Sequence, residues 1–251
     1  NLGYPPKAIK DLCEETGISK SDSVIDMGLM EEKVRHVLND EAPRAMCVLD
    51  PLKVIISNYP EDKSEVLKAA CHPQQEALGQ RELPFSREIF IERDDFMENP
   101  VGKFFRLAPG KEVRLRSSYV IKCEEVIKNE QGEVIELHCS YDENTLGKKP
   151  EGRKVKGVIH WVDANSALPC DIKLFDRLFN VENPAASDDF VKQLNPDSLV
   201  ELTGALVEPS MQNNEVGSVF QFERQGYFKL LNKAERFEFH RVVNLKDTWQ
   251  K

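Results

Sequence analysis

Residues 110–126, GKEVRLRSSYVIKCEEV, indicate the fold class because apolar residues recur there with a period of two. Val113 and Leu115 alternate with Arg114 and Arg116. A strand therefore buries the first pair and holds both guanidinium groups on its polar face. A solvated outer face is the ordinary interpretation of such a pattern, and a surface that binds something anionic and planar is the alternative.

Short strands and turns are predicted on both sides of this stretch. The segments 119–127 (YVIKCEEVI) and 133–141 (EVIELHCSY) flank the turn signal KNEQG and predict a β-hairpin. Residues 45–59, AMCVLDPLKVIISNY, predict strands with a bulge or turn at Asp50-Pro51. Residues 71–87 predict an irregular excursion. Further strands are expected in EIFIE (88–92), VKGVIHWV (155–162), LPCDIKLFDRLF (168–179), SLVELTGAL (198–206), SVFQFERQGYFKLL (218–231) and EFHRVVNL (238–245).

The first forty residues instead predict two amphipathic helices. PPKAIKDLCEETG (5–17) has proline at its start and Gly17 as a stop signal. MGLMEEKVRHVLND (27–40) places Met30, Val34, Val37 and Leu38 on one stripe. Neither helix buries its stripe alone, so we expect both to pack on a following or absent domain. The fold class predicted for the whole chain is mainly β, with two barrels or sandwiches after a short helical segment.

Charge is unevenly distributed along the 251 residues. Aspartate and glutamate number 43 against 34 lysines and arginines, a net charge of −9. Between Lys103 and Lys122, however, six basic residues face a single acid, and KKPEGRKVK (148–156) has five basic residues and one acid. Local basic tracts in an otherwise acidic protein indicate that a polyanion could be bound at those tracts and not over the whole surface. No apolar run approaches the ~18 residues that span a membrane.

Signatures of catalysis or metal binding are missing from the sequence. It has no G-x-x-x-x-G-K-[ST], G-x-G-x-x-G or G-x-S-x-G motif, and its five histidines stand in unrelated contexts. The six cysteines are scattered without a C-x-x-C pair, which favours reduced core residues in a cytoplasmic protein over a metal site. We therefore assign no catalytic residue, no metal and no cofactor. A β-rich hydrolase with a hidden pair of carboxylates, or a protein-interaction barrel, remains as an alternative.

Other polar residues favour recognition of nucleic acid. Arg44 lies in EAPRAM, and Arg106 lies in KFFRL beside two aromatic residues. Gln221 and Arg224 lie in FQFERQGYF, where alternation directs the phenylalanines inward and Gln221 outward. Unpaired bases are recognised by stacking on aromatic or guanidinium planes and by hydrogen bonds to their edges.

Several of these runs together resemble the C-terminal, anticodon-binding region of bacterial glutaminyl-tRNA synthetases. The runs are EAPRAM, GKEVRLRSSYVIK, GRKVKGVIHWV, FQFERQGYF and LKDTW, in that order, and the resemblance covers essentially the whole chain. It implies two packed β-barrels of the ribosomal-protein type that binds 5S rRNA. Residues 1–41 would be a helical stub, 42–162 the first barrel and 163–251 the second, with segments exchanged and the C-terminal strand returning to the first. Glutamyl-tRNA synthetases share the barrels and a K-G-x-I-H-W-V run, and are the alternative.

The resemblance also implies which residues contact the anticodon. Arg44, Gln221 and Arg224 match positions that hold the middle base, and Arg106 matches the arginine at the third base. Arg114, with Arg116 beside it, matches the reader of the first base, and Lys103 and Thr248 match neighbouring contact positions. Phe105 stands where the family tends to have a basic or polar residue.

The implied partner is the anticodon loop of tRNA(Gln), with no DNA or membrane partner and a monomeric state. The HIGH-type and KMSKS-type motifs of the catalytic domain do not occur, and the sequence starts Asn-Leu-Gly-Tyr-Pro-Pro without a leader. We interpret the chain as a non-catalytic fragment of an ATP-dependent ligase whose ATP and Mg²⁺ bind to an absent catalytic domain. A non-catalytic RNA-binding β-barrel protein is the further alternative.

Overall fold

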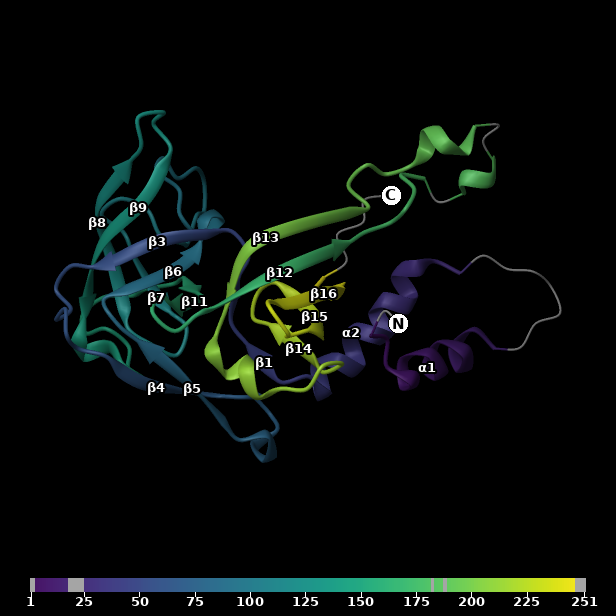
Figure 1. The fold of residues 1–251 in the computed structure, drawn as a ribbon, viewed down its shortest axis with the longest axis horizontal. Helices are drawn as coiled ribbons and strands as arrows, with labels where there is room; N and C mark the ends of the chain where they lie inside the picture. The colour runs from purple at the N-terminus through teal and green to yellow at the C-terminus, as the bar shows by residue number, and fades with distance from the viewer. Residues whose placement is uncertain (1–2, 18–24, 182, 187–188, 247–251) are drawn as a thin grey trace. The chain divides into compact units, whose positions relative to one another are not determined.

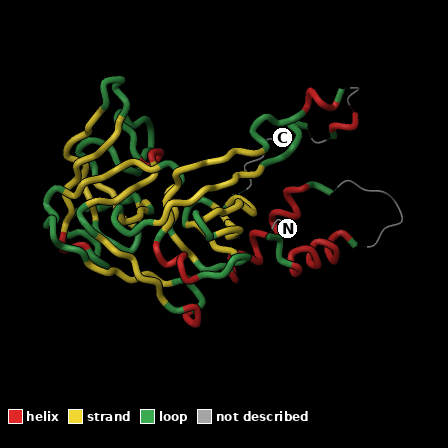
Figure 2. The backbone as a smooth tube through the Cα atoms, in the orientation of Figure 1, coloured by secondary structure: helices red, strands yellow, loops and turns green. Residues whose placement is uncertain are grey.

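A computed structural model describes residues 3–17, 25–181, 183–186 and 189–246 of the chain (Figure 1). The fold is mainly β, with barrel-like sheets and two N-terminal α-helices among the described residues, as predicted (Figure 2). The chain divides into two compact units, each described here by itself. Unit 1 comprises residues 1–43, 170–203 and 215–251, and unit 2 comprises residues 44–169 and 204–214.

Unit 2 is built on one sheet whose two edge strands are consecutive in the sequence. The strand order is β10-β7-β8-β9-β3-β6-β11. The bounds are β3 Pro51–Ile56, β6 Glu88–Glu92, β7 Glu112–Leu115, β8 Val120–Lys128, β9 Val134–Asp142, β10 Val158–Ile159 and β11 Trp161–Asp163. The edge strands β10 and β11 are separated in sequence only by His160. The single strand predicted over VKGVIHWV is therefore two short ones, and the sheet closes toward a barrel at His160.

The interior of this barrel follows from the alternation of apolar residues. Val113 and Leu115 are fully buried, whereas Arg114 between them is only partly so. Cys123 and Cys139 face each other across the β8–β9 hairpin and are buried, as expected of reduced core cysteines. Asp50 interrupts the strands where predicted. There the Glu92 carboxylate accepts hydrogen bonds from the backbone N–H groups of Leu49 and Asp50.

A two-stranded ribbon makes the prediction for residues 71–87 partly wrong. Strand β4 (Glu65–Ala70) pairs antiparallel with β5 (Gln80–Phe85). The sequence pattern did not indicate β5 because a charged residue, Arg81, occupies one of its buried positions. The Arg81 side chain is buried against Glu208, with its Nε 2.8 Å from the Glu208 Oε1. Burial raises the pKa of Glu208, and the Arg81 charge opposes that shift. The remaining short strands are β1 (Arg44–Ala45) and β2 (Cys47–Val48), and β2 pairs with the end of β13.

Unit 1 is built around phenylalanines on adjacent strands. Its strands are β12 (Leu168–Phe175), β13 (Leu199–Val207), β14 (Val219–Phe222), β15 (Gly226–Asn232) and β16 (Phe237–Asn244), and the first two begin or end in unit 2. The order is β14-β15-β16-β12-β13, with β12 parallel to β16. The rings of Phe222 and Phe228 stack at 4.7 Å, and Phe239 meets Phe222 edge-on at 5.0 Å. All three rings are fully buried.

The two helices cover the outer side of these strands. Helices α1 (Pro6–Thr16) and α2 (Met27–Glu41) have the predicted bounds to within a residue or two, and Gly17 ends α1 at a φ of 70°. Their apolar stripes, including Val34 and Leu38, share a cluster with Tyr227 and Val242. The two helices therefore pack on the β15–β16 hairpin of unit 1, which is the surface that the sequence alone did not identify.

Among the described residues, no helix is long and apolar enough to cross a membrane. The same residues hold no cluster of three or more histidine, cysteine, aspartate or glutamate side chains that suits a metal ion. Of the six cysteines, Cys13 is exposed and Cys71 is partly exposed, contrary to the expectation of core residues, whereas Cys47 and Cys170 are buried as expected.

Candidate nucleic-acid interface

The residues predicted to contact RNA are divided between the two units. Unit 2 carries Arg44, Lys103, Arg106, Arg114 and Arg116, and unit 1 carries Gln221 and Arg224. Thr248 lies outside the described residues.

Arg114, on β7, is held by backbone carbonyl groups. Its Nη1 donates to the carbonyl oxygens of Ser118 at 3.0 Å and Thr145 at 2.8 Å, and its Nη2 donates to that of Lys148. Three of the five N–H donors of a guanidinium are thereby used. The donor on Nε and one on Nη2 remain without a partner among the described residues. Two donors are what a bidentate contact with a base edge requires.

Arg114 also lines a hollow of about 650 Å³ in unit 2. The walls come from β4, from the turn between β7 and β8, and from residues 146–149. Four of the lining side chains are cationic, namely those of Lys68, Arg114, Lys148 and Lys149, and none of the described lining residues is acidic. In a chain of net charge −9, this hollow is a local concentration of positive charge, which favours an anionic ligand.

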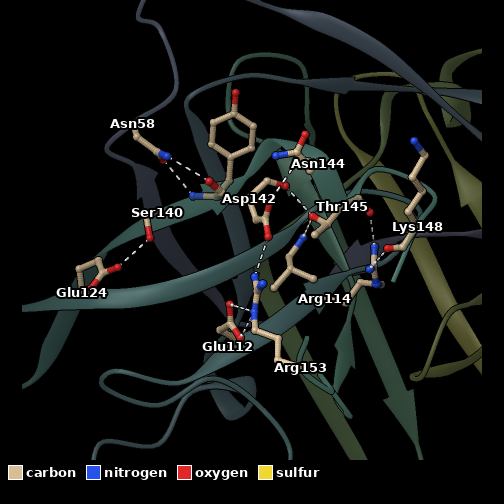
Figure 3. Close-up of polar contacts among 12 residues, drawn as sticks. Asn58, Glu112, Arg114, Glu124, Ser140, Asp142, Asn144, Thr145, Lys148 and Arg153 are labelled. Carbon is tan, nitrogen blue, oxygen red and sulfur yellow. Dashed lines mark hydrogen bonds and ion pairs between the residues drawn. The ribbon is translucent and has the colours of Figure 1, made fainter. Parts of the chain in front are cut away.

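The loop behind Arg114 is fixed by a second network, drawn in Figure 3. Thr145 accepts a hydrogen bond from the Val120 backbone at its Oγ1 and donates from it to the Asp142 carbonyl. Arg153 bridges two strands, since its Nε lies 2.9 Å from Glu112 and its Nη2 lies 2.6 Å from Asp142. The Arg153 guanidinium thereby lowers the pKa of Asp142. Arg114 is thus held in an ordered frame.

Arg116 follows the last residue of β7 and is exposed. Its backbone N–H donates to the carbonyl of Ile159, and its own carbonyl accepts from the indole of Trp161 at 2.9 Å. The predicted alternation holds across residues 113–116, because Val113 and Leu115 are buried while both arginines reach solvent.

Arg106 lies in the loop between β6 and β7, and its guanidinium is also anchored. Its Nη1 donates to the Asp94 carbonyl at 2.9 Å, and its Nε lies 3.3 Å from the buried Asp95 carboxylate. The guanidinium carbon lies 6.0 Å from the centre of the Phe104 ring, a cation–π distance. Lys103, in the same loop, is exposed, and none of the described residues forms an ion pair with it.

Gly157 connects this loop with β7. Its carbonyl accepts the Arg114 backbone N–H at 3.0 Å. A Cβ on Gly157 would lie 1.8 Å from the Phe105 carbonyl oxygen and 3.0 Å from the Val113 side chain. Only glycine permits this approach, so the segments bearing Arg106 and Arg114 are packed together through one residue.

Arg44 is 8% exposed in β1, and its backbone N–H donates to the carbonyl of Cys71 at 2.6 Å. The resemblance assigns it to the same base as Gln221 and Arg224, which belong to unit 1, whereas Arg44 belongs to unit 2.

In unit 1, Gln221 points away from the phenylalanine core, as predicted. It lies between the buried Phe220 and Phe222 on β14 and is itself partly exposed. Its side-chain Nε2 donates to the Tyr227 hydroxyl at 2.8 Å. The amide oxygen is then directed by this bond and can accept from a ligand.

Arg224 lies in the tight turn from β14 to β15, with a φ of 71°. A left-handed conformation costs a non-glycine residue about 1 kcal/mol or more, and it is enriched at functional sites. The Gln225 backbone N–H closes the turn on the Phe222 carbonyl at 2.9 Å. The stacked Phe222 and Phe228 hold both strands, so the turn is rigid at its base.

Sequence reasoning missed part of this arrangement. Lys68 belongs to the unpredicted ribbon, and in the sequence Tyr227 stands only as part of an aromatic run. Lys148 and Lys149 belong to a basic tract of the sequence, but nothing in that tract indicates that they lie beside Arg114. The tract KKPEGRKVK was the available signal for them.

Cationic and amide side chains anchored on barrel-like β units, with aromatic rings beside them, are typical of β proteins that bind unpaired nucleotides. Comparison with known families refines this class. The model for tRNA synthetases class I (E and Q), anti-codon binding domain, matches residues 42–142, and a second model of the same description matches residues 158–230. The chain belongs to this anticodon-binding family.

Curated relatives agree along nearly the full chain. A glutamine–tRNA ligase of Pseudomonas syringae pv. tomato is 51% identical over 98% of this chain and 44% of the relative. Those of Vibrio campbellii and Azotobacter vinelandii are 49% and 50% identical over 99% and 98% of this chain, and 45% of each relative. The chain thus spans a little under half the length of the curated relatives it matches.

Proposed function

We propose that this chain recognises the anticodon loop of tRNA(Gln) as part of a glutaminyl-tRNA synthetase. The observation that carries the proposal is Arg114, whose guanidinium is fixed by three carbonyl groups at a cationic hollow and retains two donors. Family membership and the glutamine–tRNA ligases among the relatives support it.

The proposed contacts are divided by base. Arg114, assisted by Arg116, reads the first anticodon base from unit 2. Gln221 and Arg224 read the middle base from unit 1, Arg106 contacts the third, and Lys103 makes a neighbouring contact. Arg44 and Thr248 remain proposed contacts from the resemblance alone. Each two-point contact with a base edge contributes about 1–3 kcal/mol of discrimination, by analogy with base reading in DNA.

The attachment of glutamine to tRNA is proposed for the whole ligase and not for this chain by itself. The relatives are more than twice as long as the part matched here, and the proposed role of the matched part is to bind RNA. ATP and Mg²⁺ would be used by the remainder of such a ligase. We propose that binding proceeds without either.

The test is binding of this chain to a 17-nucleotide anticodon stem-loop of tRNA(Gln), measured by fluorescence anisotropy against the same RNA with the middle base swapped. We expect at least tenfold weaker binding of the swapped RNA. Added salt should weaken the binding of both RNAs to the same extent, because phosphate contacts release counterions. Equal affinity for the two RNAs contradicts the proposal. Preference for the tRNA(Glu) stem-loop supports the glutamyl alternative instead.

A further inference from the structure

Phe105 and Lys156 form a feature that the anticodon contacts above do not use. We propose that the Phe105 ring, with the Lys156 ammonium over it, is a stacking platform for an unpaired nucleobase beside Arg106. The inference rests on the proposed function and deepens it, because it adds a base-contacting residue of a different chemical kind. Phe105 occupies a position at which the sequence resemblance leads one to expect a basic or polar side chain.

The first argument is the exposure of the ring. Phe105 is 49% exposed, whereas the other aromatic side chains of unit 2 are buried, as Phe85 and Trp161 are, or partly buried. The adjacent Phe104 is partly buried and packs beside the Arg106 guanidinium. Phe104 therefore serves the loop itself, whereas Phe105 presents ring surface to solvent. Bases of any identity stack on such surfaces because every base has a π face.

The second argument is the charge beside the ring. The Lys156 Nζ lies 4.7 Å from the centre of the Phe105 ring. A cation at this distance is attracted to the ring, and its charge also favours an RNA backbone nearby. No described residue forms an ion pair with Lys156. The basic tract at residues 148–156 thus ends next to the exposed aromatic ring.

The third argument is that the platform is held in place. On one side of Phe105, Arg106 is fixed by Asp95 and the Asp94 carbonyl, and Leu107 is fully buried. On the other, Gly157 lies against the Phe105 backbone too closely for any Cβ. An aromatic platform that is ordered before binding loses little conformational entropy when a base stacks on it. Because Arg106 is the next residue, the third anticodon base is the one proposed to stack.

Phe105→Leu is the informative substitution, since leucine keeps an apolar side chain of similar reach but has no π face. The probes are the tRNA(Gln) anticodon stem-loop and the same RNA with an abasic third anticodon position. We expect Phe105→Leu to weaken binding of the intact stem-loop about tenfold. The abasic RNA, which has no base to stack there, should bind the wild type and Phe105→Leu about equally. Lys156→Ala should weaken binding of the intact RNA by a smaller factor, about threefold, and should make binding less dependent on salt, because one cation near the phosphates is lost.

Val101 provides the matched control, because it is a 77% exposed apolar residue in the same loop. Val101→Ala should bind both RNAs as the wild type does, and the thermal unfolding midpoint of Phe105→Leu should match that of the wild type. Equal binding of the intact stem-loop by wild type and Phe105→Leu overturns the inference, as does an equal loss on intact and abasic RNA. Failure of the proposed function is distinguishable, because the wild type would then not discriminate against the middle-base swap.

Discussion

The candidate site residues of the two units are held in place by different means. In unit 2, Arg106 and Arg114 are fixed through their guanidinium groups, which bond to carbonyl oxygens and to Asp95. In unit 1, the backbone of Arg224 is fixed in a left-handed turn between strands stacked by phenylalanines. Removing an arginine should therefore loosen a loop in unit 2, whereas in unit 1 the turn keeps its own backbone hydrogen bond and its stacked phenylalanines.

The largest effect is expected for Arg114→Ala. Three carbonyl groups lose their donor, so the free energy of unfolding should fall by about 2 kcal/mol while stem-loop binding falls about 100-fold. Denaturant unfolding and anisotropy on the same samples measure both. Arg114→Lys keeps the charge but not the planar fork, and should recover only part of each loss. If Arg114→Ala left the free energy of unfolding unchanged, the proposed difference between the arginines of unit 2 and unit 1 would be wrong.

Arg224→Gly should affect binding more than it affects stability. Glycine adopts a φ of 71° without strain, and its greater freedom in the unfolded chain offsets that gain. We expect stem-loop binding to weaken tenfold or more, mainly by loss of preference for the cognate middle base, with a smaller fall in the thermal midpoint than Arg114→Ala shows. A fall as large as that of Arg114→Ala would show that the Arg224 side chain supports the turn as strongly as Arg114 supports its loop.

Arg153→Ala tests whether the frame behind Arg114 matters. The Arg153 bond lowers the pKa of Asp142, so ionised Asp142 contributes stability above its unfolded pKa of about 4, and this contribution is lost as the pH falls through the lower folded value. The difference in thermal midpoint between wild type and Arg153→Ala should thus be present at pH 7 and disappear in acid. Binding should weaken about threefold, through the loop that holds Arg114. A midpoint difference that persists at pH 2 contradicts this assignment.

Tyr227→Phe should have the smallest effect. It removes the hydroxyl that accepts from Gln221 Nε2 and leaves the ring in the core beside the helices. We expect discrimination at the middle base to fall about threefold, with overall affinity for swapped RNA unchanged. Gln221→Ala in the Tyr227→Phe background should then add less than it does in the wild type, because the two residues act through one hydrogen bond. Additive losses of discrimination in the double variant would show that Gln221 and Tyr227 act independently.

Much of the fold could be predicted because burial in β-barrels follows a period of two. Val113 and Leu115, the β8–β9 hairpin and the strand break at Asp50 were all visible as local patterns. The ribbon of β4 and β5 was not, because Arg81 is buried by pairing with Glu208, which is 127 residues away in sequence. The division of VKGVIHWV at His160 likewise depends on the closing of the sheet.

The candidate site was predictable as a set of residue types and not as an arrangement. Alternation placed Gln221 and Arg114 on polar faces, and the structure places them there. The carbonyl groups that hold Arg114 come from residues 118, 145 and 148, and only the folded chain brings these together. The left-handed conformation of Arg224 has no signal in its residue type, because arginine is not a residue that favours it.

The division of base reading between the units can be tested most directly by comparing two variants with the wild type on the cognate RNA and two swapped RNAs. Wild type, Arg114→Ala and Arg224→Gly are each titrated with the cognate stem-loop and with stem-loops swapped at the first or at the middle anticodon base. Arg114→Ala should lose discrimination at the first base and retain it at the middle base, and Arg224→Gly should do the reverse. Equal loss at both positions in either variant would contradict the account.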